Sequence, residues 1–157
     1  MNIINIFWNW YEKHLKINVS IAAFLFFWQL IHLIWLTGDV VLERLIGVNI
    51  ITLNTFLETL IIIVDYTEIP ALLLVSLVYI NELRKRFHYK SLLYLLFLNS
   101  QWLHIFWITD EFVIQYLAGS DIGFLPFWLA WLAIFIDYLE LPVMYDTIKR
   151  AINYLGS

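Results

Sequence analysis

Four long apolar stretches dominate this chain and restrict what it can fold into. They run approximately over residues 17–36, 51–80, 92–114 and 124–145. Each is at least as long as the roughly 20 residues that an α-helix needs to cross the hydrocarbon core of a bilayer. Because a spanning segment must satisfy its backbone groups internally, these stretches predict helices. We therefore expect an all-α integral membrane protein, a bundle of four transmembrane helices.

The composition agrees with this class and excludes several others. Hydrophobic residues make up 62% of the chain and charged residues 14%, whereas soluble domains have about 45–50% apolar and about 25% charged residues. The absence of cysteine excludes iron–sulfur clusters and thiolate metal ligands. The formal net charge of -4 argues against nucleic acid as a partner. The predicted partner is the lipid bilayer.

Basic residues predict the orientation of the spans. Of the nine Lys and Arg residues, only Arg44 lies outside the segments before the first span, between the second and third, and after the fourth. The positive-inside rule therefore places the N-terminus, the basic loop 81–91 and the C-terminal tail 151–157 in the cytoplasm. Residues 1–16, which are rich in Ile and Trp, are expected to lie at the membrane interface.

The two halves of the chain share a set of polar residues 72 positions apart. Gln29, His32, Trp35 and Asp39 return as Gln101, His104, Trp107 and Glu111, and the motif DYTEIP at 65–70 returns as DYLELP at 137–142. Residues 17–80 and 92–150 are therefore predicted to be two repeats of two helices each. Two spans per repeat leave both halves in the same orientation, so the pseudo-two-fold axis should follow the membrane normal.

The repeated acids predict a charged site inside the bundle. Asp65 and Glu68 lie three residues apart, on one face of a helix, and Asp137 and Glu140 repeat this pair. Each acid within a span costs on the order of 2.5–3.5 kcal/mol if it is ionised and unpaired. No Lys or Arg lies within the four stretches to balance them. Protons, the two histidines within the spans or a bound cation can therefore neutralise these acids, and the number of potential ligands favours the cation.

Two histidines complete the predicted metal site. Its ligands are predicted to be His32, Asp65, Glu68, His104, Asp137 and Glu140, with Asp39 and Glu111 as further candidates toward the outer ends of their spans. Two imidazoles and four carboxylates resemble the ligand set of ferritin-like di-iron bundles, although there a histidine shares a helix with a glutamate. The resemblance implies two metal ions, and mixed nitrogen and oxygen ligands suit iron, zinc or manganese.

Other repeated residues are expected to support or line this site. Gln29 and Gln101 lie one turn from the histidines, so they either orient the imidazoles or bond to a neighbouring helix. Trp35 and Trp107 either line the cofactor site or belong to the aromatic belt of the membrane interface.

The residues around the repeated acids predict local backbone features. Tyr66 and Tyr138 point away from the acids beside them, which predicts a helix-packing role with a hydroxyl partner. Pro70 and Pro142 follow the glutamates by two residues and each remove one helical hydrogen bond. We expect freed backbone carbonyls close to the site.

Several functions agree with such a site. The leading hypothesis is a di-metal oxidoreductase that acts on a lipidic or other small hydrophobic substrate. A metal transporter is an alternative, although few polar residues continue toward the cytoplasm. His32 and His104 can instead be the axial ligands of one haem, which leaves the four acids unexplained. A small structural subunit of a larger membrane complex, or a homo-oligomer, is a further alternative.

The last alternative needs no metal. Four spans, cytoplasmic termini and His and carboxylate side chains within the membrane resemble the architecture of the EXPERA group of sterol isomerases and sigma-2-type receptors. The resemblance implies acid–base chemistry on a lipid, or binding of a lipid-like ligand. The 72-residue repeat does not map onto that family's motif, so no residue roles are carried over.

Overall fold

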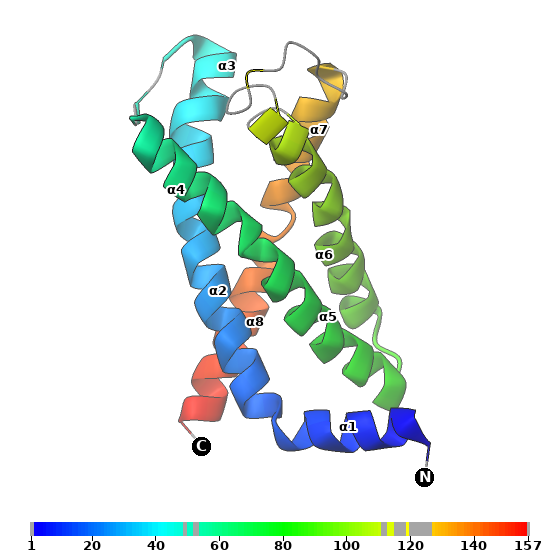
Figure 1. Ribbon diagram of the computed structural model, residues 1–157. Coiled ribbons are helices and arrows are strands. Elements are labelled where there is room, and N and C mark those ends of the chain that lie inside the picture. The colour runs from blue at the N-terminus through cyan, green and yellow to red at the C-terminus, as the bar shows by residue number, and fades with distance from the viewer. Residues whose placement is uncertain are drawn as a thin grey trace.

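The computed structural model describes residues 2–48, 50–51, 54–110, 113–114, 119 and 127–156. All regular secondary structure within these residues is helical. The helices are α1 (Ile3–Lys13), α2 (Leu15–Trp35), α3 (Leu42–Ile46), α4 (Thr55–Tyr66), α5 (Glu68–Lys85), α6 (Tyr89–Ile108), α7 (Phe127–Tyr138) and α8 (Leu141–Leu155), and a π-helical segment, η1 (Leu36–Val41), joins α2 to α3 (Figure 1). The all-α prediction is confirmed for these residues.

Three helical segments are long and apolar enough to cross a membrane. They are Leu15–Ile46, Thr59–Lys85 and Tyr89–Ile108, and they overlap the first three predicted spans. The first continues through η1 and α3, beyond its predicted end at residue 36. The fourth predicted span, 124–145, begins outside the described residues and continues into α7 and α8. Large apolar side chains such as Phe24, Ile34 and Phe106 stay at least 60% exposed, which is typical of a surface that meets lipid.

The long helices pack side by side around one core. α2 contacts α5 and α8, while α6 contacts α5 and α7. Phe26, Leu72, Val75 and Leu98 are almost fully buried between them. Ala71 is also buried, and a side chain this small lets neighbouring helices approach closely. The packing leaves the middle of the bundle enclosed on several sides.

Helical hydrogen bonding is interrupted within both Asp-x-x-Glu motifs. α4 ends at Tyr66 and α5 begins at Glu68, while α7 ends at Tyr138 and α8 begins at Leu141. The prolines contribute because proline has no N–H to donate to the carbonyl four residues back. The segment 51–80, predicted as one span, therefore contains two helices, and its two acids lie at the junction.

α1 lies across one end of the bundle, next to both chain termini (Figure 1). The side chain of Asn2 caps it by accepting a hydrogen bond from the Ile4 amide. Glu12 forms ion pairs with Arg84 and Lys85 at the end of α5. The segment predicted to be interfacial is thus attached to the end of the bundle that carries most of the basic residues.

Candidate metal centre

The six predicted metal ligands meet in the interior of the bundle. They come from α2, α4, α5, α6, α7 and the junction before α8, and they are His32, Asp65, Glu68, His104, Asp137 and Glu140. None of the six is more than 3% exposed. Because residues far apart in the sequence supply them, the packing of the helices alone brings them together.

Asp65 lies between the two histidines. Its Oδ1 atom is 3.4 Å from Nε2 of His32 and 3.4 Å from Nε2 of His104. Oδ2 of Asp137 is 3.5 Å from Nε2 of His32, and the two imidazole ring centroids are 5.6 Å apart. The Nε2 atoms of both rings therefore face the carboxylates.

The potential ligand atoms form three groups, each with its atoms within 4.8 Å of one another. The groups are His32 with His104 and Asp137, Asp65 with Glu68 and His104, and Glu68 with Asp137 and Glu140. Glu68, His104 and Asp137 each belong to two groups. The three groups are consequently one connected cluster.

Most polar atoms of this cluster make no hydrogen bond to any residue that the structure describes. These atoms are both ring nitrogens of His32 and His104, both carboxylate oxygens of Asp65 and Glu68, Oδ2 of Asp137 and Oε1 of Glu140. Buried polar groups are nearly always hydrogen-bonded, and each exception costs about 1–3 kcal/mol. Four carboxylates also outnumber two imidazoles, so a cation suits both the charge and the orphaned atoms.

Gln29 and Gln101 hold the interrupted helices in place. Nε2 of Gln29 donates to the carbonyl oxygens of Val64 (2.8 Å) and Asp65 (3.4 Å), and Nε2 of Gln101 donates to those of Ile136 (3.1 Å) and Asp137 (3.3 Å). These carbonyls lie in the last turns of α4 and α7, where Val64, Ile136 and Asp137 also accept backbone hydrogen bonds from the amides three residues on. Of the two predicted roles, the structure shows the bond to a neighbouring helix, and the glutamines position the acids through their backbone.

The hydroxyl groups of the repeated tyrosines bond to threonines of other helices. The hydroxyl oxygen of Tyr138 lies 2.6 Å from Oγ1 of Thr37, and that of Tyr66 lies 2.5 Å from Oγ1 of Thr109. This is the hydroxyl partner that the sequence predicted. Thr37 and Thr109 also recur 72 positions apart. This shared spacing is the feature of the sequence that associates them with the repeated tyrosines.

Trp35 and Trp107 lie beside the histidines and inside the bundle. Their side chains are 3% and 2% exposed. The ring centroids of Trp35 and His32 are 5.7 Å apart, and those of Trp107 and His104 are 5.5 Å apart. The arrangement agrees with the predicted lining role, since belt tryptophans face lipid.

The two outer acids are placed differently. Asp39 lies on η1, half-buried, and belongs to none of the three described ligand groups. Glu111 lies outside the described residues. The cluster that the structure describes therefore consists of the six inner ligands.

Comparison with known proteins finds no matching family model, no matching curated protein and no matching solved structure. The resemblance to the EXPERA group, which rests on architecture, stays a prediction. The interpretation of this centre therefore rests on its own residues and their geometry.

Proposed function

We propose that the protein is an integral membrane protein whose bundle holds two transition-metal ions, of iron, zinc or manganese type, between its two halves. The observation that carries this proposal is the cluster of six buried ligands with orphaned polar atoms. Burial of four acids beside two imidazoles is costly without a partner of positive charge. Bound cations remove that cost and use the donors already turned toward one another.

Contacts that recur 72 positions apart support a duplicated pair of helices. The bond from Gln29 to the Val64 carbonyl recurs from Gln101 to the Ile136 carbonyl. The pairing of Thr37 with Tyr138 recurs, with the halves exchanged, as Thr109 with Tyr66. Equivalent contacts on both sides of one centre are what a pseudo-two-fold axis through that centre produces.

The geometry favours metal ions over a haem. Oδ1 of Asp65 is equally close to Nε2 of both histidines, so a carboxylate already lies between the two predicted axial ligands. The three connected ligand groups provide enough donors for two ions, with Glu68, His104 and Asp137 placed where two groups meet. Carboxylate and imidazole side chains that project inward from several helices are also the ligands of di-metal bundles.

The chemistry that we propose for the centre is oxidation–reduction of a hydrophobic substrate. Iron or manganese with imidazole and carboxylate ligands supplies redox chemistry when bound. The protein side chains hold the ions, and the surrounding apolar helices exclude water from them. Trp35 and Trp107 add bulk beside each histidine.

Metal analysis of the purified protein tests the proposal. Wild-type protein, extracted in mild detergent, is expected to contain about two equivalents of transition metal per chain. The double variant His32→Ala/His104→Ala should lose most of it. The matched control is His14→Ala/His88→Ala, which removes a half-buried and an exposed histidine outside the cluster and should keep the wild-type content. Wild-type protein without stoichiometric metal, or a site variant with unchanged metal, would falsify the proposal.

A further inference from the structure

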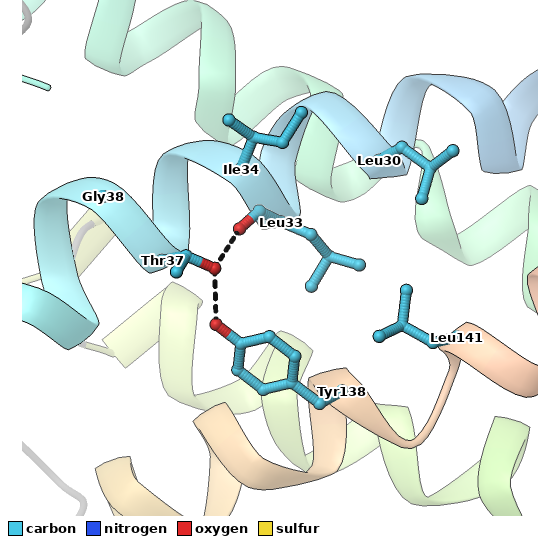
Figure 2. A pocket seen from close by; sticks show the side chains of 7 residues that line it. All are labelled: Leu30, Leu33, Ile34, Thr37, Gly38, Tyr138 and Leu141. Carbon is cyan, nitrogen blue, oxygen red and sulfur yellow. Dashed lines mark hydrogen bonds between the residues drawn. The ribbon is translucent and has the colours of Figure 1, made fainter.

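An apolar groove on the outside of the bundle lies beside the candidate centre. It has a volume of about 460 Å³ and lies between α2 and the junction of α7 with α8. Leu30, Leu33 and Ile34 form one wall, and Tyr138 and Leu141 form the other (Figure 2). The volume falls within the range of about 300–1,000 Å³ that small-molecule sites occupy.

The walls of the groove belong to the same helical turns that hold the ligands. Leu33 follows His32, Tyr138 follows Asp137 and Leu141 follows Glu140 in the sequence. Consecutive residues of a helix point in different directions, so the ligand of each pair faces inward while its neighbour faces the groove. The groove and the candidate centre therefore lie on different faces of the same helical turns.

The lining of the groove selects for hydrocarbon. Its polar side chains are Thr37 and Tyr138, and they already bond to each other. Oγ1 of Thr37 also donates to the Leu33 carbonyl at 2.7 Å, as Figure 2 shows. None of the described residues that line the groove carries a charge. A polar ligand would lose its hydration without gaining partners, whereas a hydrocarbon chain loses nothing.

The groove opens on the surface that faces lipid. Ile34 is 65% exposed and Leu141 is 41% exposed, and α2 is part of the most extended apolar segment of the described chain. In a membrane, the medium outside this surface is made of acyl chains. Acyl chains are therefore both the molecules next to the groove and the ligands that its apolar lining favours.

Three residues that line the groove differ from the residues 72 positions further along the chain, whereas the candidate metal ligands are the same residue types in both halves. The positions of Leu30, Ile34 and Gly38 correspond, 72 residues on, to Trp102, Phe106 and Asp110. Each counterpart is larger, and Asp110 is acidic. Smaller side chains are therefore a property of the wall that α2 and η1 contribute, and the counterparts show which substitutions would fill the groove.

We propose that this groove is a binding site for one acyl chain of a bilayer phospholipid. The site does not depend on the metal, but it places the chain beside the proposed centre. Its apolar lining, its position on the lipid-facing surface and its volume support this occupant.

Photolabelling tests the site directly. Purified protein is placed in phosphatidylcholine vesicles that contain a small fraction of phosphatidylcholine with a diazirine on one acyl chain, and labelled peptides are mapped by mass spectrometry. Label should concentrate on the segments 30–38 and 138–141. The variant Leu30→Trp/Ile34→Phe, which introduces the counterpart residues, should reduce this label several-fold. Leu141→Trp, from the opposite wall, should do the same.

The control variant is Ile63→Phe/Leu73→Trp, which makes similar changes at two exposed positions of α4 and α5 and should label as wild type does. Label spread evenly over the exposed helices, or unchanged in both groove variants, would overturn the proposal. Competition by oleic acid but not by unlabelled phosphatidylcholine would also overturn it, since the occupant would then be a free fatty acid.

Metal content of each sample keeps this test separate from the proposed function. Localised label in a protein without metal refutes the metal centre and supports the groove. Metal-loaded protein with dispersed label refutes the groove alone. The groove variants should retain wild-type metal, because they change no ligand, and that retention also shows that they are folded.

Discussion

Glu68 and Glu140 occupy equivalent positions in the two Asp-x-x-Glu motifs but differ in the number of ligand groups that they join. Glu68 belongs to two groups, and Glu140 belongs to one. Both side chains are almost completely buried. The pair therefore offers a comparison of two chemically identical residues in which only the position relative to the other ligands differs.

We predict that Glu68→Gln lowers metal binding more than Glu140→Gln does. Loss of a partner of a metal ligand already weakens affinity by about 10–100-fold, and Glu68 contributes to two groups where Glu140 contributes to one. Titration of metal-depleted protein with Zn²⁺ measures both affinities. Glu12→Gln, which removes an acid paired with Arg84 and Lys85 outside the cluster, serves as the control. Equal losses of Zn²⁺ affinity in the two site variants would show that membership in two ligand groups gives Glu68 no larger role than Glu140.

A polar network joins α5, α6 and α8 at the end of the bundle near the termini. Asp146 of α8 accepts hydrogen bonds from Tyr79, Lys90 and Arg150. Arg150 also pairs with Glu82 of α5. Each acid in this network has a cationic partner, in contrast to the acids of the candidate centre. The network thus stabilises helix packing without a bound ion.

Titration of Asp146 should make this packing sensitive to acid. Burial raises the pKa of Asp146, but hydrogen bonds from Lys90 and Arg150 outweigh it and leave that pKa below its ordinary value of 3.8. The folded state thus favours the carboxylate, so the stabilisation is complete above pH 3.8 and is lost as the pH falls through the lowered pKa.

We predict that Asp146→Asn destabilises the protein by on the order of 1 kcal/mol near neutral pH, the net contribution of a typical hydrogen bond. The difference from wild type should shrink below pH 3.8, because the wild-type carboxyl then also becomes neutral. Thermal unfolding in detergent, from neutral pH to below pH 3.8, measures the difference in stability between wild type and variant. A constant difference at all pH values would show that the charge of Asp146 does not matter.

The basic residues and the two termini gather at one end of the bundle. α1, the connection between α5 and α6 and the C-terminus lie at this end, and α3 lies at the other (Figure 1). The positive-inside rule assigns the first end to the cytoplasm. This orientation is a prediction that the absence of native cysteine makes simple to test.

We predict that single cysteines report two opposite sides of the membrane. His88→Cys and Leu155→Cys should react with a membrane-impermeant maleimide only in inside-out vesicles, and Leu45→Cys only in right-side-out vesicles, since these positions are exposed at opposite ends. Leu98→Cys, fully buried, should react only after denaturation. Labelling of Leu155→Cys from the side opposite to His88→Cys would mean that the chain does not cross back after α6.

Much of the fold class and of the ligand set could be predicted from the sequence because both follow from costs that act locally. An apolar stretch of this length predicts a helix wherever it lies in the chain. Acids such as Asp65 and Glu68 in such a stretch predict a partner of positive charge. The stretch contains no Lys or Arg that could be this partner. His32 and His104 were identified by their recurrence at the same spacing.

Other features became apparent only in the folded structure, because they depend on the distances and rotations between helices. The interruption between α4 and α5, the bond from Gln29 to the Val64 carbonyl and the wider role of Glu68 all require two or more helices in a defined orientation. The groove beside Leu33 likewise depends on how α2 meets α7 and α8. The pattern of polar and apolar residues indicated which side chains are buried together. Which of their atoms come within reach of one another depends on tertiary packing, because many small contacts along whole helices set the relative positions of those helices.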